Sequence, residues 1–311
     1  MRIKGMYGVV LVALAAALVA CGGSNDDEAD KPPSAADARK LLQQTFGPNP
    51  NASSGKLDGS VTIRVEGVRR FAEPVTLRAS GPFNQSGDAP PEANLSGGLR
   101  LGSSAIGGEL ILIDDEALIG LGDTAYRIPD SIAATIRRPL RNSDNALTSV
   151  LAVFGIAPQR WAENPRIVGN ETVGGVETVH ATAELDRQRF FLDVARLTKV
   201  LTSLRITEVT GLPRDVDRRA RVALSRSVKS ATGHIWSGAE DHVLRKASFS
   251  MTIEPSAAER RTLGGISSMK VNGQLEVTEV GTEQRVEPPR NRGSYRALQT
   301  TLDALADAAR R

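Results

Sequence analysis

Cys21 is the only cysteine among the 311 residues, so the chain cannot form an internal disulfide. An uncharged run from Met6 to Ala20 precedes it, and Arg2 and Lys4 come before that run. A basic start, a short apolar run and small residues before a cleavage point are typical of a secretory signal peptide. The run is shorter than the roughly 20 residues that a membrane-spanning helix needs. The single thiol therefore stands at a predicted cleavage site, where it is available for chemistry on sulfur.

The four residues Leu18-Val19-Ala20-Cys21 resemble a bacterial lipobox. The resemblance to lipoprotein precursors implies that residues 1–20 are removed and that Cys21 is acylated and becomes the first residue of the mature chain. Because two or more acyl chains anchor a protein stably, we expect an extracytoplasmic protein attached to the cell membrane through Cys21. Residues 21–34, with no apolar periodicity, are the expected flexible tether. The alternative is an ordinary signal peptide that happens to end at a cysteine.

Two fragments imitate the motifs of penicillin-binding enzymes, but their context is wrong for that chemistry. Ser53 and Lys56 fit S-x-x-K, and residues 143–145 fit S-D-N, while K-T-G is absent. The nucleophilic serine in such enzymes starts a helix, whereas Ser53 lies in a turn-like stretch. We interpret both matches as chance and predict that the protein is not an enzyme.

The three histidines, His180, His234 and His242, have no i, i+4 spacing that would place two of them on one helix face as metal ligands. His180 and His234 lie in predicted strands and His242 at a turn. We therefore expect structural or surface histidines, no metal site and no cofactor.

The charge balance argues against a nucleic-acid partner. The whole chain carries a formal charge of +3, and removing residues 1–20 takes away two basic residues, which leaves 37 minus 36, or +1. A nucleic-acid-binding protein normally has a strong basic excess, because it must displace the counterions of the phosphates. Nucleic acid is excluded as a partner on this ground.

The apolar pattern predicts strands interrupted by helices. Strand-like alternation is expected at 61–65, 74–79, 93–101, 109–113, 117–122, 166–172, 176–185, 232–237, 243–253 and 266–280, with a loop at 81–91. Helical spacing is expected after an N-cap at Ser34 and at 130–138, 146–154, 186–204, 213–229 and 295–311. Antiparallel meanders with inserted helices form an α+β fold.

The order of these elements resembles the LolA-like lipoprotein carriers, especially lipoproteins of the LppX/LprG type. The residues that carry the resemblance are the hairpin at 168–185, the helix that follows, and the tryptophan-bearing hairpin with His234-Ile235-Trp236 and residues 243–246. The resemblance implies one domain at 35–290, built as a strongly curved antiparallel half-barrel whose concave face is covered by helices. The basic stretch 213–229 and a C-terminal amphipathic helix within 291–311 depart from the family pattern.

The resemblance also implies an apolar cavity that binds acylated lipids or glycolipids, to carry or present them in the cell envelope. The lining is expected to include Phe190, Val194, Leu197 and Leu201 of one helix and Leu147, Val150, Leu151 and Phe154 of another. An aromatic content of 4% leaves few bulky side chains to fill a wide sheet, which favours a cavity. A solid core of sheet and helices remains the alternative.

The most basic segment of the chain is expected to contact lipid headgroups or the membrane surface through Arg218, Arg219, Arg221 and Arg226. A basic amphipathic helix beside a lipid anchor can lie on anionic headgroups, although a solvated helix face has the same pattern. The second hypothesis for function is an envelope protein that binds a protein partner through its sheet or its C-terminal helix. Leu298, Leu302 and Leu305, at helical spacing, are its basis.

Overall fold

The computed structural model describes residues 33–87, 89–102, 104–114, 116–137, 144–153, 155–204 and 215–308. Residues from Pro33 onward form one compact unit, which contains every helix and strand discussed below. The predicted signal peptide, Cys21, the tether up to residue 32, and Phe154 lie outside the described residues.

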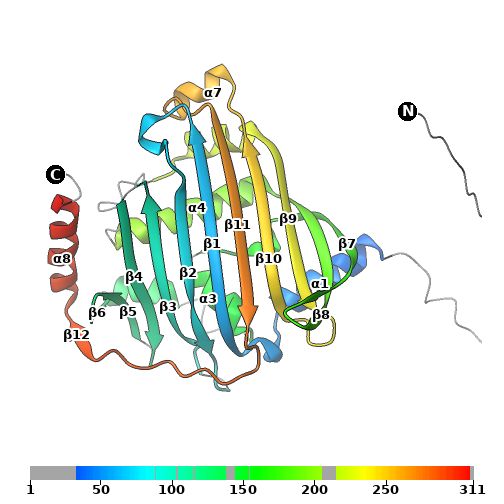
Figure 1. Cartoon of the computed structure of the whole chain (residues 1–311), viewed down its shortest axis with the longest axis horizontal. Helices are drawn as coiled ribbons and strands as arrows, with labels where there is room; N and C mark the ends of the chain where they lie inside the picture. The colour runs from blue at the N-terminus through cyan, green and yellow to red at the C-terminus, as the bar shows by residue number, and fades with distance from the viewer. Residues whose placement is uncertain are drawn as a thin grey trace, which may run out of the picture. The chain divides into compact units, whose positions relative to one another are not determined.

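A single sheet of twelve strands in the described residues forms the framework of this unit (Figure 1). Its order is β12-β6-β5-β4-β3-β2-β1-β11-β10-β9-β8-β7, and every pairing is antiparallel except the parallel contact of β12 with β6. The strands are β1 (Ser54–Glu66), β2 (Val75–Asn84), β3 (Glu92–Leu101), β4 (Ser104–Ile113), β5 (Glu116–Leu121), β6 (Thr124–Arg127), β7 (Ala162–Val173), β8 (Val176–Leu185), β9 (Val228–Gly238), β10 (Leu244–Ile253), β11 (Ser268–Thr278) and β12 (Asn291–Gly293). Because β12 and β7 do not pair with each other, the curved sheet is unclosed, and the predicted α+β half-barrel is confirmed.

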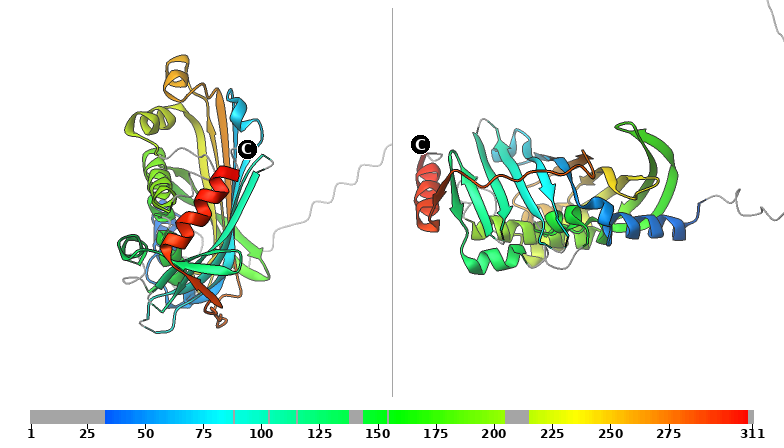
Figure 2. Two further views of the ribbon diagram at one scale, coloured as in Figure 1. Left: turned by 90° about the vertical axis from the view of Figure 1, so that its left-hand side faces the viewer. Right: turned by 90° about the horizontal axis from the view of Figure 1, so that it is seen from below.

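Helices lie mainly on one side of the sheet, as the two side views show (Figure 2). They are α1 (Ala35–Phe46), α2 (Asp130–Arg137), α3 (Ala146–Val153), α4 (Arg187–Ser203), α6 (Arg218–Ser227), α7 (Ala257–Thr262) and α8 (Tyr295–Ala308). The predicted N-cap at Ser34 is present, and Asp37 completes a capping box at the start of α1. α8 lies beyond the sheet edge formed by β4, β5 and β6 (Figure 1).

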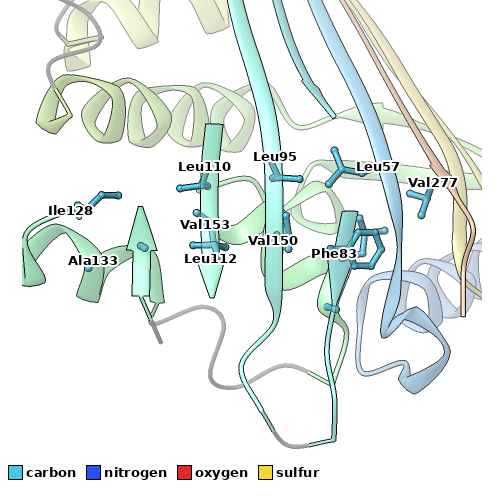
Figure 3. Packing of buried hydrophobic residues seen from close by; sticks show 14 of the residues in the cluster. Leu57, Phe83, Leu95, Leu110, Leu112, Ile128, Ala133, Val150, Val153 and Val277 are labelled. Atoms are coloured by element: carbon cyan, nitrogen blue, oxygen red, sulfur yellow. The ribbon is translucent and has the colours of Figure 1, made fainter. Parts of the chain in front are cut away.

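The core between sheet and helices follows from strand alternation. Leu95, Leu110 and Leu112 point from β3 and β4 toward Val150 and Val153 of α3 (Figure 3). Each of these five side chains is at most 9% exposed. Alternate strand residues face one side, so the helices need to cover only that side.

The structure corrects several predicted boundaries. The loop expected at 81–91 begins later, because β2 continues through Pro82 to Asn84 and buries Phe83 completely. The helix expected at 213–229 is shorter, since the chain turns into β9 at Val228. The short elements α7, β6 and β12 were not predicted, because each has too few residues to show a period.

Candidate functional site

A row of glycine and alanine residues crosses the concave face at mid-height. Gly59 of β1 pairs with Ala79 of β2, Ala79 pairs with Gly97 of β3, and Gly97 pairs with Gly108 of β4. Four neighbouring strands thus place a residue with little or no side chain at the same level. A Cβ added at Gly97 would have no neighbouring atom closer than 3.4 Å, so the space in front of it is open.

A second, adjacent row forms one wall of this space. Gly273 of β11 pairs with Phe249 of β10, and Phe249 pairs with Gly233 of β9. A Cβ at Gly273 would lie 2.0 Å from a ring atom of Phe249, so the glycine leaves the room that the ring occupies. The ring packs edge-on against Trp161 and Phe190, with centroid separations of 6.4 and 5.5 Å.

Helices close the space opposite these rows. The cavity has a volume of about 440 Å³, within the range of about 300–1,000 Å³ that is usual for small-molecule sites. Its helical lining consists of Leu42 and Phe46 of α1, Val150, Leu151 and Val153 of α3, Leu197, Val200, Leu201 and Leu204 of α4 and its C-cap, and Leu302 of α8. A space lined in this way offers contacts to hydrocarbon.

Two charged residues border the cavity with their backbone atoms, while their charged side chains point away from it. Arg78 and Glu109 are next in sequence to Ala79 and Gly108, whose positions face the cavity. Because successive strand residues point to opposite faces, both charged side chains are directed to the outer side of the sheet. The described lining is therefore almost wholly apolar. A hydrocarbon chain that leaves the cavity would lose no hydrogen bonds to this lining.

The structure places four of the predicted lining residues, Val150, Leu151, Leu197 and Leu201, at the cavity. Phe190 packs instead in an aromatic cluster with Trp161, at 5.1 Å between centroids, and Val194 packs against that cluster. Leu147 is 1% exposed and belongs to the solid core beside the cavity. Phe154 lies outside the described residues. Helical spacing alone does not separate residues that line a cavity from those that pack beside it.

The Gly/Ala row was missed by the sequence analysis. Its members are at least 11 residues apart along the chain and are brought together only by strand register. A signal was present, since isolated glycines inside strand patterns often mark a close approach or a binding space.

His180 and His234 meet on the outer side of the sheet, although they are 54 residues apart. His180 Nε2 lies 3.1 Å from His234 Nδ1, and His180 Nδ1 lies 2.7 Å from Glu171 Oε1. Trp236 stacks on His180 at 4.4 Å between centroids, and its Nε1 donates to Glu171 Oε2 at 2.8 Å. Lys246 Nζ lies 5.2 Å from the Trp236 ring centroid. Both nitrogens of His180 are thus occupied by protein partners.

The surroundings shift the pKa values of two side chains in this cluster. The hydrogen bond from Trp236 is the main cause that lowers the pKa of Glu171, and His180 adds to the effect. Burial, followed by the nearby His180, lowers the pKa of His234. Among the described residues, no group of three His, Cys, Asp or Glu side chains is arranged to hold a metal ion.

The four predicted arginines lie on α6, where Asp217 caps the helix by accepting from the backbone N–H of Ala220 at 2.7 Å. Arg218, Arg219 and Arg226 are exposed. Arg221 is half-buried, and its Nη1 donates to the carbonyl of Val216 at 2.8 Å. Three of the four guanidinium groups therefore face solvent.

The C-terminal helix is packed against the fold. Leu298 and Leu302 of α8 are 0% and 4% exposed, while Leu305 is 39% exposed. The Tyr295 hydroxyl donates to the carbonyl of Ser203 at 3.3 Å. Two of the three leucines proposed for a protein partner are thus used inside the chain. No helix in the described part of the chain is long and apolar enough to cross a membrane.

Comparison with known proteins gives likeness in structure only. No protein-family model matches the chain, and no curated protein sequence matches it. Among solved structures, LprF from Mycobacterium bovis is 11% identical, with 83% of this chain and 99% of that chain covered and a TM-score of 0.41. Lipoprotein LppX from Mycobacterium tuberculosis is 13% identical, with coverage of 82% and 100% and a TM-score of 0.39. A LolA-superfamily protein from Nitrosomonas europaea is 10% identical, with coverage of 81% and 94% and a TM-score of 0.25.

These structures include members of the group that the sequence resembles. At such identities and TM-scores the likeness says nothing about ligand or activity, which have to be argued from the residues of this chain.

Proposed function

We propose that this chain is a non-enzymatic, membrane-anchored extracytoplasmic lipoprotein that binds the acyl chains of lipids or glycolipids and carries or presents them in the cell envelope. In this proposal Cys21 is acylated and residues 21–34 tether the unit to the membrane. The observation that carries it is the apolar cavity of about 440 Å³ in front of the Gly/Ala row.

The driving force is removal of hydrocarbon from water. Burial stabilises by about 0.8 kcal/mol per CH₂ group, so an acyl chain needs only apolar space to bind. Leu197 and Leu201 on one wall and the backbone of the Gly/Ala row on the other provide that space. An apolar cavity stays dry and accepts apolar ligands, whereas water requires polar partners.

The direct test is native mass spectrometry of residues 33–311, purified from a host related to the source and then extracted. This unit contains every described element and core cluster. The expected result is a stoichiometric adduct that releases acylated species. A mass without adduct, together with no uptake of added phospholipid or glycolipid, would contradict lipid binding.

A matched pair of variants ties the adduct to the cavity. Gly97→Leu places a side chain in the open space and should reduce ligand occupancy at least about tenfold, as expected when several buried CH₂ groups lose their place. Gly98→Leu makes the same change on the outer side, where the nearest atom to an added Cβ is 3.6 Å away, and should leave occupancy unchanged. Equal ligand occupancy in the two variants would show that the ligand binds at another site.

A further inference from the structure

α4 and α6 each expose a basic stripe with one aliphatic residue in its middle. On α4 the stripe consists of Arg189, Leu192, Arg196 and Lys199, at spacings of three and four residues. On α6 it consists of Arg218, Arg219, Val222 and Arg226. Residues with this spacing lie on one side of a helix. Leu192 is 43% exposed and Val222 is 41% exposed, so both aliphatic side chains reach solvent.

The two helices are neighbours on the side away from the sheet. Leu224 of α6 packs against the buried cluster that contains Phe190 and Phe191 of α4. In the left view of Figure 2, α4 in green and α6 in yellow-green lie one above the other, beside the sheet. We call the two exposed stripes together the basic helical face.

Positive charge is concentrated in these two helices. They contain eight basic residues and one acidic residue, a balance of +7, whereas the whole chain has +3. The remaining residues therefore sum to −4. The one acidic residue, Asp193, is 3% exposed and accepts from Arg196 at 2.6 Å.

Three acidic residues at the borders of the face cap helices. Asp186 and Asp217 cap α4 and α6, and Asp186 also pairs with Arg189 at 3.1 Å. Glu259 forms the capping box of α7 with Ser256. These carboxylates hold helix ends and leave a surplus of exposed cations on the face.

We propose that the basic helical face docks on the surface of an anionic phospholipid bilayer. The arginines and Lys199 would pair with headgroup phosphates, while Leu192 and Val222 enter the boundary between headgroups and acyl chains. Basic amphipathic helices bind membranes in this way, by combining attraction to anionic lipid with burial of exposed apolar side chains. Because the charge of the face is positive and concentrated in two helices, an anionic bilayer is the partner that fits it.

Docking in this orientation would bring the cavity near the membrane. The other face of α4 lines the cavity through Leu197, Val200 and Leu201. A helix with its side chains is about 10 Å thick, so only one helix layer would separate the bilayer surface from the cavity. The basic helical face and the described cavity lining share no residue. The docking proposal can therefore fail while the lipid-binding proposal holds, and the reverse.

The test is co-sedimentation of residues 33–311 with vesicles, so that no lipid anchor contributes. Binding is expected to equimolar phosphatidylglycerol and phosphatidylcholine at low salt, but not to phosphatidylcholine alone, and high salt should release it. Arg218→Glu, Arg219→Glu and Arg226→Glu together should weaken binding at least about tenfold, since each basic residue near an anionic surface contributes about 1 kcal/mol, or about fivefold.

A control of equal charge change uses the opposite layer. Arg64→Glu, Arg78→Glu and Arg100→Glu alter exposed arginines of β1, β2 and β3 that alternate to the outer side of the sheet, and binding should stay within about twofold. Equal loss in both triple variants would mean that net charge alone acts, and this would overturn the proposal. No binding to anionic vesicles, or equal binding to neutral ones, would also overturn it and leave the face to solvent or a protein partner.

The aliphatic pair gives a second readout. Leu192→Ser with Val222→Ser should weaken vesicle binding several-fold, while Val168→Ser, at a residue that is 58% exposed on β7, should not. Unchanged binding of the double variant would contradict insertion below the headgroups.

Discussion

Strands β3 and β4 border a filled core near one end and a cavity near their middle. At the solid level Ala93 pairs with Leu112, and both belong to the buried cluster that includes residues of α3. At the hollow level, four residues away on each strand, Gly97 pairs with Gly108, and the cavity lies in front of them. Backbone pairing is the same at both levels, so the difference lies in side-chain volume. A cavity can thus be made in a curved sheet by removing side chains along one row, without an opening in the backbone.

The largest effect is expected from matched leucine truncations at the two levels. Leu112→Ala, at a residue that is 2% exposed and packed in the solid core, should lower the free energy of unfolding by about 2–5 kcal/mol. Leu201→Ala, at a half-buried residue that already borders the cavity, should cost about 1 kcal/mol, because fewer contacts are lost. Urea unfolding of residues 33–311 measures both. Equal losses would show that the cavity is collapsed or filled by side chains in solution.

A smaller effect is expected at the wall of the cavity. Gly273→Ala brings a Cβ against the Phe249 ring and should cost about 1–3 kcal/mol, as overpacked cores do. Adding Phe249→Leu should restore much of the loss, because the smaller side chain makes room. Gly97→Ala is the control in open space and should leave the free energy of unfolding unchanged or raised. A loss at Gly97 as large as that at Gly273 would contradict the open space assigned to the row.

The smallest effect is expected for the pH dependence of stability, which should arise from the histidine cluster on the outer side of the sheet. The folded state lowers the pKa of His234 below its ordinary 6.5, so the unfolded chain binds more protons in this range. Stability is therefore fully present above about pH 6.5 and is lost as the pH falls toward the lowered value. Burial and the neighbouring His180 cause this lowering, and the charge of Glu171 opposes it.

Thermal unfolding measures this dependence between about pH 7.5 and about pH 5, a range that brackets the ordinary pKa of histidine. His234→Gln should flatten it in that window. Occupancy of the cavity, which has an almost wholly apolar described lining, should change little over the same range. An unchanged slope in the variant would assign the titration to other groups.

Much of the local structure was predictable from the sequence. The hairpin of β7 and β8, the capping box at Ser34 and the amphipathic helix α4 follow from turn glycines, a side-chain oxygen at the N-cap and 3.6-residue spacing. The curved, unclosed sheet agrees with the fold class inferred from the order of elements. The continuation of β2 through Pro82 was not predicted, because strand pairing overrode the local turn signal.

The sequence by itself determined which faces of strands and helices are apolar, since period and residue type are local properties. The tertiary structure decided which apolar residues line a cavity and which fill a core. Phe190 and Leu201 lie on the same helix at compatible spacing, yet one joins an aromatic cluster and the other borders open space. Likewise, Gly59, Ala79 and Gly97 form a row only through strand register. The physical reason is that volume at a point depends on every chain segment that reaches it, whereas periodicity depends on one.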